Sequence, residues 1–313
     1  MTPTKVPRIT VIVCTRDRPR DLAQCLPSLL ANDYPDFSVL VMDQGETDAG
    51  EGVAAEHAGP RLEYHRLAFT GRARALNAAL TRADGELLAL TDDDCLAPRF
   101  WLRRAASVLA SEPEAGIVFG GVASAPHDPA RVFVPTFQPA RYRVVRGRRV
   151  RAHRVGIGAN LVVRREVVER IGGFDESLGP GSRFRSGDDW ELAYRALRAG
   201  FAIVQDPANV IVHRGQREYA TGAVRRLIGN NYHGIGAGYA RHVRRGDWSA
   251  AYILVREGAL LAGGAAWNTL RLRRPLGVHR LAYLLLGVVR GMRRPGDGRP
   301  PARGEQWVLD EAK

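Results

Sequence analysis

The chain has 313 residues, of which 45% are hydrophobic and 25% are charged, with Gly and Pro spread regularly between the apolar runs. This length can bury the core of one large domain or two modest ones, and the composition excludes a mainly disordered chain before the last stretch. The 46 basic residues outnumber 33 acidic ones, giving a net charge of +13 with only two lysines. Arginine-favouring codon usage and attraction to phosphates or an anionic membrane surface are two explanations of this excess, and they are compatible with each other.

The cysteines and the N-terminus bear on location. Cys14, Cys25 and Cys95 lack the spacing of disulfide pairs or metal ligands, which predicts a reduced cytoplasmic protein. The first apolar run covers only residues 9–14, and arginines follow it at once. We therefore expect no secretory signal.

Residues 8–122 alternate between strand and helix patterns. Helices are expected at DLAQCLPSLLAND (21–33), GRARALNAAL (71–80) and FWLRRAASVLA (100–110). Buried strands are expected at RITVIVC (8–14), FSVLVMD (37–43), RLEYHRL (61–67), ELLAL (86–90) and GIVFGG (116–121). Short apolar strands separated by helices predict an α/β fold with a Rossmann-like, mainly parallel sheet and helices on both faces.

Residues 123–155 are rich in proline and then strongly basic. The segment RYRVVRGRRVRAHR (141–154) holds seven arginines and no acid, and its apolar positions and Gly147 predict a hairpin. A solvated sheet edge whose charges deter aggregation is one interpretation. Contact with a phosphate-bearing acceptor or with lipid headgroups is the other.

The globular pattern resumes at residue 156. A strand and a helix that stops at Gly172-Gly173 are expected within 156–176, and a further helix within 187–200. FAIVQDPANVIVHRG (201–215) predicts one or two strands ending at His213. The glycines and arginines of LGPGSRFRSG (178–187) favour a mobile lid over the site.

Beyond residue 216 the pattern becomes helical, with helices expected within 220–245, 248–270 and 277–291 and a tail at 294–313. The apolar runs at 250–267 and 281–292 are interrupted by charges, so neither reaches the ~20 apolar residues of a spanning helix. Helices that lie on a membrane and helices that simply pack on the main domain both fit. The expected division is 1–215, 216–293 and 294–313.

Polar residues follow three of the expected strands, where a parallel sheet has its binding crevice. They are Thr15-Arg16-Asp17, Asp43-Gln44 and Asp92 to Asp94. Three adjacent carboxylates repel one another unless they have a use, and carboxylate oxygens bind Mg²⁺ or Mn²⁺. Arg72 and Arg74 precede the same strand and can address a diphosphate.

Six motifs in a fixed order carry a family resemblance. They are VIVCTRDRP (11–19), VMDQGETD (41–48), ALNAALTRADGELLALTDDD (75–94), GANLVVRREVVERIGGFDE (158–176), GDDWELAYRALRAGF (187–201) and VIVHRG (210–215). With these motifs, residues 8–215 resemble the family 2 glycosyltransferases, which have the GT-A fold. The resemblance implies an inverting, metal-dependent transferase that uses Mg²⁺ or Mn²⁺.

The resemblance also implies roles for the donor-side residues. Thr15, Arg16 and Asp43 match positions that hold the nucleotide base. Asp92 matches the ribose contact and Asp94 the metal ligand, with Asp93 between them on the nucleotide side. The turn Asp43-Gln44-Gly45-Glu46 departs from the usual Asp-Asn-Gly-Ser, and the Ala-Leu-Asn variant at 75–77 leaves only approximate diphosphate roles for Arg72 and Arg74.

On the acceptor side, the resemblance implies that Asp189 is the general base. The family usually has Glu-Asp at this point, and this chain has Asp188-Asp189, so Asp188 stays an alternative. His213 matches a position that contacts the metal or the diphosphate. The alternative interpretations are purely structural: Asp188 and Asp189 would cap the helix, and His213 would be a core or surface histidine whose hydrogen bonds are satisfied within the fold.

We therefore expect transfer of a sugar from a UDP-, GDP- or dTDP-sugar to a glycan, lipid-linked or small-molecule acceptor. The place of action would be the cytoplasm or, by peripheral contact, the inner face of the cell membrane. A nucleotidyltransferase is the alternative enzyme, although CTRDRP lacks the glycines of a phosphate loop. A noncatalytic module that binds nucleotide sugars or membranes is the other alternative, and no nucleic-acid partner is expected, because no recognised module accompanies the charge.

Overall fold

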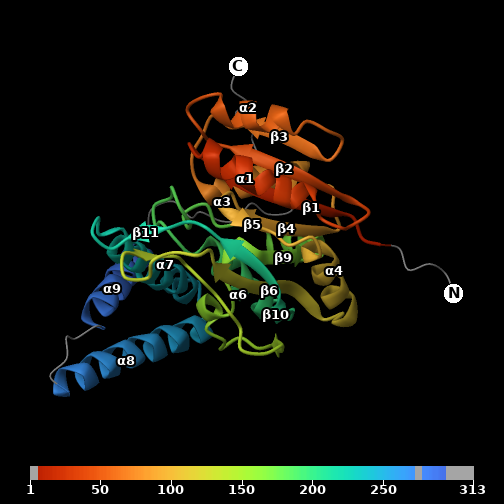
Figure 1. Cartoon of the computed structure of the whole chain (residues 1–313). Helices are drawn as coiled ribbons and strands as arrows, with labels where there is room; N and C mark the ends of the chain where they lie inside the picture. The colour runs from red at the N-terminus through yellow and green to blue at the C-terminus, as the bar shows by residue number, and fades with distance from the viewer. Residues whose placement is uncertain (1–5, 272–276, 294–313) are drawn as a thin grey trace.

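The computed structural model describes residues 6–271 and 277–293 of the chain (Figure 1). The tail predicted at 294–313 lies outside these residues. A large sheet forms the centre of the molecule, and its strand order is β3-β2-β1-β4-β9-β6-β10-β5, with β8 paired to β10.

The six longer strands of this sheet are β1 (Ile9–Thr15), β2 (Phe37–Asp43), β3 (Leu62–Arg66), β4 (Leu87–Asp92), β6 (Ala115–Ser124) and β10 (Ala202–His213). The shorter ones are β5 (Cys95–Leu96), β8 (Arg143–Val145) and β9 (Leu161–Arg164), while β7 (Val132–Phe133) and β11 (Arg217–Glu218) form a separate pair. Strands β1 to β4 run parallel, as do β6 and β10, and β9 lies antiparallel between β4 and β6. The mainly parallel sheet is therefore as predicted, with β9 as a reversed insertion.

Helices cover both faces of the sheet because the strand side chains alternate. In β1, Val11 and Val13 pack with α1 (Pro19–Leu30) and α4 (Trp101–Ser111). Ile12 points to the other face, which is covered by α3 (Arg72–Arg82), α5 (Arg165–Ile171) and α6 (Asp188–Arg198). The short α2 (Ala49–Glu56) lies beside β3, and two 3₁₀ turns occupy Ala152–Arg154 and Gly158–Asn160.

The three predicted C-terminal helices are confirmed as α7 (Ala223–Arg244), α8 (Trp248–Leu270) and α9 (Val278–Met292). Buried polar contacts join α7 and the residue that caps α8 to α6. His242 lies 3.0 Å from Glu191, and the Tyr194 hydroxyl donates to Asp247 over 2.6 Å. Among the described residues, no helix combines the length and the apolar character needed to cross a membrane.

The hairpin predicted at 141–154 is wrong. Residues 143–145 form a single strand, β8, which pairs antiparallel with Ile203–Gln205 of β10. The chain then leaves the sheet and enters the 3₁₀ turn, where Arg151 and Arg154 form ion pairs with the buried Glu257 of α8. The apolar residues of this segment thus use an open edge of the main sheet, and two of its arginines meet a distant acid that local sequence could not reveal.

Candidate functional site

The acidic triplet begins in β4 and continues directly after it, at the carboxyl end of the parallel strands. Asp92 is one-third exposed, whereas Asp93 and Asp94 are buried. The Thr15 hydroxyl donates to Asp93 over 2.7 Å, and Arg18 lies 3.1 Å from Asp93 and 3.0 Å from Asp94. Burial raises the pKa of Asp93 to about 6, although Arg18 and Thr15 oppose the shift.

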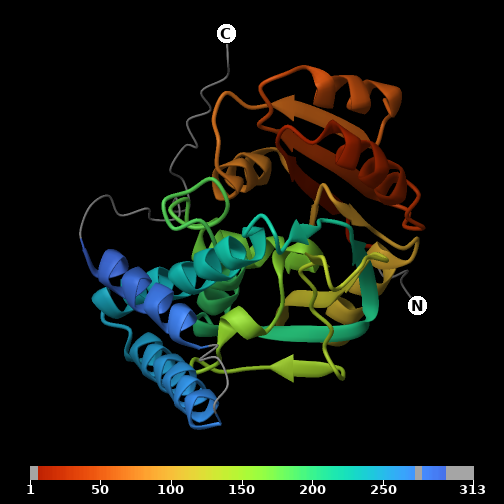
Figure 2. The same cartoon turned by 60° about the vertical axis from the view of Figure 1, so that its left-hand side comes forward.

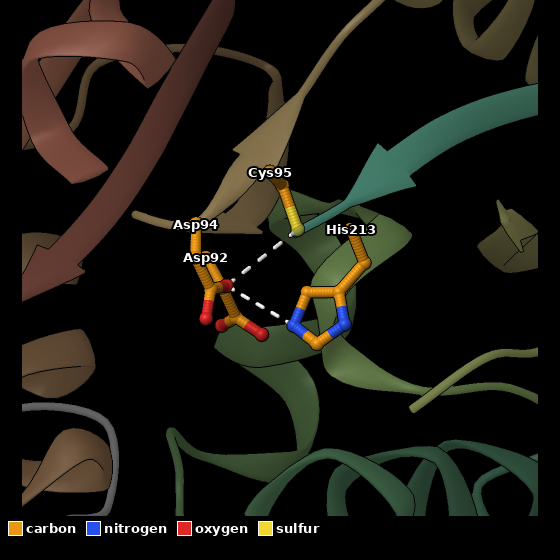
Figure 3. A group of neighbouring side chains, drawn as sticks. All are labelled: Asp92, Asp94, Cys95 and His213. Atoms are coloured by element: carbon orange, nitrogen blue, oxygen red, sulfur yellow. Dashed lines mark hydrogen bonds and ion pairs between the residues drawn. The ribbon is translucent and has the colours of Figure 1, made fainter. Parts of the chain in front are cut away.

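A second strand brings a histidine to this triplet. Figure 3 shows the ligand atoms of Asp92, Asp94, Cys95 and His213, which all lie within 4.8 Å of one another. His213 Nε2 is 3.1 Å from an Asp94 carboxylate oxygen, and its Nδ1 faces the Pro135 carbonyl at 3.0 Å. Burial disfavours the charged form of Asp94, but contacts with His213 and Arg18 outweigh it and lower its pKa.

This donor set fits a hard divalent cation. Burial raises the pKa of the Cys95 thiol well above its usual range, so the thiol stays protonated and the available ligands are carboxylate oxygens and an imidazole nitrogen. The backbone at Gly215 also passes very close to these ligand atoms. A Cβ at Gly215 would lie 2.3 Å from an Asp94 oxygen and 3.0 Å from His213 Nε2. Only a glycine lets the chain pass this close.

Arg72 joins the triplet to the beginning of α6. Its guanidinium lies 3.0 Å from Asp92 and 2.7 Å from Asp188, two residues 96 positions apart in the chain that come from β4 and α6. Asp188 is buried, so the arginine balances a charge that would otherwise lack compensation. The two acidic motifs therefore meet around one side chain.

Asp189 lies next to this pair with different partners. Its carboxylate accepts hydrogen bonds from the backbone N–H groups of Gly158, at 2.6 Å, and of Trp190, at 2.7 Å. Burial, followed by the negative charge of Asp188, raises the pKa of Asp189 to about 6. A carboxyl group of this kind can accept a proton more readily than an ordinary aspartate.

The loop at 178–187, for which a lid was predicted, lies directly over this region. The backbone N–H of Arg72 donates to the Pro180 carbonyl over 2.9 Å. A Cβ at Gly179 would lie 2.8 Å from the Asp188 carboxyl carbon. Phe184 is buried in a small cluster with Leu178 and Ala237 of α7. The loop is thus attached to α7 on one side and to the site on the other.

The structure places three predicted residues away from the triplet. Asp43 is buried at the end of β2, where it accepts hydrogen bonds from the Gly45 N–H and the Tyr64 hydroxyl. Arg16 is exposed and ion-paired with Asp17 and Glu46. Arg74 lies over the ring of Phe69, 3.9 Å from its centroid. Beside Asp43, a cavity of about 680 Å³ is lined by Gln44, Gly45, Glu46, His65, Arg66, Leu67, Ala68, Phe69, Thr70 and Arg82.

Sequence reasoning missed Arg18 and Gly215. Arg18 stands in the same TRDRP segment as Arg16, and its polar character gave the only signal. Arg16 directly follows β1 and points outward, whereas Arg18 begins the turn into α1 and reaches the acids. Gly215 had no signal beyond its place after His213, because its role depends on a close approach of two distant segments.

Similar proteins were found both by sequence and by structure. A pre-mycofactocin glycosyltransferase of Mycobacterium tuberculosis is 26% identical over 299 residues, which cover 91% of this chain and 57% of that protein. An N-acetylglucosaminyltransferase of Mesorhizobium japonicum is 36% identical over 96 residues, covering 29% of this chain and 23% of the relative. The chain thus spans less than two thirds of the length of both relatives.

Among solved structures, the mannosyltransferase PcManGT from Pyrobaculum calidifontis, in complex with GDP-Man and Mn²⁺, has a TM-score of 0.63 and 24% identity. The match covers 93% of this chain and 88% of that one. S. aureus TarS 1–349 in complex with UDP-GlcNAc has a TM-score of 0.55 and 16% identity, covering 73% and 66% of the two chains. The shared fold confirms the predicted GT-A architecture.

The sequence of the chain also matches the sequence model of one protein family. The match to "Glycosyltransferase like family 2" extends over residues 7–230 and so includes every element from β1 to the beginning of α7. It contains Asp92 to Asp94, Asp188, Asp189 and His213. Because this match covers well over half of the chain, the protein belongs to the glycosyltransferase-like family 2.

Proposed function

We propose that the chain is an inverting, metal-dependent glycosyltransferase. It would move a sugar from a nucleoside-diphosphate sugar to a hydroxyl group of a glycan, lipid-linked or small-molecule acceptor. The observation that carries the proposal is the position of Arg72 between Asp92 and Asp188, since it brings the donor-side and acceptor-side acids to one place. Transfer needs both kinds of group within reach of one sugar.

The donor diphosphate would meet the cation and the arginines. Asp94 and His213, with Asp92 beside them, would hold Mg²⁺ or Mn²⁺. A bound cation of this kind supplies positive charge to the diphosphate as it leaves. Arg18 and Arg72 would add charge at the same place, since both already contact the triplet. Arg74 stays a predicted contact that would require its guanidinium to leave the Phe69 ring.

The nucleotide would occupy the edge of the sheet formed by β1 and β2. Thr15, Arg16 and Asp43 are the residues predicted for the base, and the cavity beside Gln44 offers space there. Asp93 would act through Thr15, to which it is hydrogen-bonded. PcManGT with GDP-Man and TarS with UDP-GlcNAc support a nucleotide-sugar donor, so UDP-, GDP- and dTDP-sugars are the candidates.

Asp189 would accept the proton of the incoming hydroxyl. Two backbone N–H groups orient its carboxylate, and its raised pKa makes proton uptake easier. Asp188 is less suited to this task because its charge is already paired with Arg72. With the base on one side of the sugar and the diphosphate on the other, in-line displacement inverts the anomeric carbon.

We also propose the predicted location and division of the chain. The three free cysteines fit a cytoplasmic protein that works on nucleotide sugars. Residues 1–215 would form the transferase domain and residues 216–293 a helical extension that handles the acceptor or a membrane surface.

Release of nucleoside diphosphate tests the proposed activity. We expect slow release from one sugar nucleotide of a UDP-, GDP- and dTDP-sugar panel, dependent on Mn²⁺ or Mg²⁺ and reduced at least about tenfold in Asp94→Asn. Asp33→Asn is the matched control because Asp33 pairs with Arg103 on the surface, with both side chains 61% exposed. Release of pyrophosphate would instead identify a nucleotidyltransferase, and donor binding without turnover on any acceptor would identify a noncatalytic module.

A further inference from the structure

The outward face of α8 is apolar along its whole length. Eight exposed, uncharged residues recur there at helical spacing, at positions 248, 252, 255, 259, 262, 263, 266 and 270. Trp248 is 85% exposed, Val255 73% and Leu270 78%. The opposite stripe of α8, which includes Ile253 and Leu261, is buried. Apart from the ion-paired Glu257, α8 is thus apolar on its buried side as well as on its exposed side, and such a helix needs apolar surroundings on both sides.

Helix α9 repeats this arrangement. Leu284, Gly287 and Gly291 are buried, while Val278, Leu285, Val289 and Met292 on the other side are exposed. The two helices contact each other, since a Cβ at Gly277 would lie 2.8 Å from the Leu261 carbonyl oxygen. Both lie at the end of the molecule opposite to α2 and β3 (Figures 1 and 2). Their exposed apolar residues are named here the α8–α9 outer surface.

The charges around this surface have one sign. Residues 219–293 contain twelve arginines and only two acids, Asp247 and Glu257. Both acids are buried and ion-paired, Asp247 with Arg198 and Glu257 with Arg151. The exposed Arg256 lies on α8 and Arg271 directly follows this helix, beside the apolar residues. Arg290 on α9 is exposed as well, and its guanidinium lies 3.3 Å from His233 of α7. A second copy of the chain would bring the same positive charge to the contact, whereas an anionic lipid surface complements it.

We propose that the α8–α9 outer surface binds anionic lipid membranes. The exposed Trp248, Tyr252 and Trp267 have the ring chemistry that favours the boundary between headgroups and acyl chains, and the arginines reach the headgroup phosphates. The helices lie on the membrane and do not cross it, in keeping with their length and apolar character. This inference rests on the role proposed for residues 216–293, but membrane binding needs no catalysis, so vesicle binding and sugar transfer can fail independently.

Cosedimentation of the full chain with vesicles tests this surface. The vesicles contain phosphatidylcholine alone, or phosphatidylcholine and phosphatidylglycerol in equal amounts. We expect binding to the anionic vesicles, weakened by added salt, and a loss of at least about tenfold in Val255→Glu/Leu285→Glu. The matched control is Val6→Glu/Phe100→Glu, which makes the same charge change at two exposed apolar residues outside the surface and should bind as the wild type does.

A second pair of variants tests the arginines. Arg256→Gln/Arg271→Gln should lose about fivefold in affinity per arginine for the anionic vesicles, with circular dichroism unchanged. Equal binding of all variants would overturn the proposal, as would absence of binding to either vesicle. A dimer in sedimentation velocity that Val255→Glu/Leu285→Glu dissociates, without vesicle binding, would also overturn it and assign the surface to a second copy.

Discussion

At the scale of single residues, the adjacent carboxylates of Asp188 and Asp189 differ in what they contact. Asp188 is paired with a guanidinium, whereas the described hydrogen bonds of Asp189 come from backbone N–H groups. An arginine partner stabilises the ionised carboxylate, and burial beside another acid destabilises it. Two neighbours in sequence therefore have different surroundings, which fits the roles that we propose for them, charge balance for Asp188 and proton transfer for Asp189.

The raised pKa of Asp189 predicts the pH dependence of transfer. The base must be ionised to accept a proton, so the rate at saturating donor should be full above the raised pKa and should fall as the pH drops through about 6. For an aspartate with an ordinary pKa, the fall would come roughly two pH units lower. Initial rates between pH 5 and 8 measure this, and a rate independent of pH over that range would remove Asp189 from proton transfer.

Arg72 and Arg16 offer a matched pair of arginines. Arg72→Met leaves the buried Asp188 without its partner and should reduce the free energy of unfolding by about 3 kcal/mol near neutral pH. Arg16→Met breaks only exposed ion pairs and should cost less than about 1 kcal/mol. Urea denaturation measures both. An equal decrease in the free energy of unfolding in the two variants would show that Arg72 does not link the two acidic motifs.

The sequence predicted the residue types at the site better than their directions. Asp92, Asp94, Asp188, Asp189 and His213 come together, although they lie up to 121 positions apart, because each lies within two residues of the end of a strand or the beginning of a helix that the sequence pattern predicts. The arginines could not be assigned in this way. The long side chains of Arg16, Arg18 and Arg74 can each reach several partners, and tertiary contacts decide which partner each one contacts.

At the scale of elements, the site depends on backbones that approach closely. β10 ends at His213, and Gly215 follows it across the face of Asp94. The added methyl group of Gly215→Ala would push these elements apart and should weaken Mn²⁺ binding by about tenfold or more. Titration calorimetry measures the affinity. Gly52→Ala, where a Cβ meets nothing within 4 Å, is the control, and equal affinities in both variants would contradict the account.

Local pattern predicted most elements and missed those fixed by distant pairing. β2 is buried throughout, and β1 and β4 are buried except at Cys14 and Asp92. The predicted ranges of α7, α8 and α9 agree with the structure within a few residues. The strand pattern of β9 was visible, but its antiparallel place between β4 and β6 was not. Residues 141–154 have the local pattern of a hairpin. The pattern could not reveal their actual partners, β10 and Glu257, because these lie far away in sequence.

At the scale of the whole molecule, Glu257 fastens the helical extension to the sheet. It is buried in α8 and ion-paired with Arg151 and Arg154, which follow β8. Glu257→Leu removes the acid paired with the largely buried Arg151 and should reduce the free energy of unfolding by about 3 kcal/mol. Val255→Leu changes an exposed neighbour and should leave stability unchanged. If the two variants unfolded alike in urea, this ion-pair cluster would not be what holds α8 in place.

The whole molecule thus combines the proposed donor edge, the proposed acceptor-side carboxylate and a basic, apolar end in one fold. We propose that acids from β4 and α6 serve one reaction in separate roles. Donor affinity and transfer rate, measured side by side in Asp189→Asn, test it most directly. We expect that binding of the sugar nucleotide with Mn²⁺ changes less than about threefold, while transfer falls at least about 100-fold. Equal loss of binding and transfer, or transfer near the wild-type rate, would contradict it.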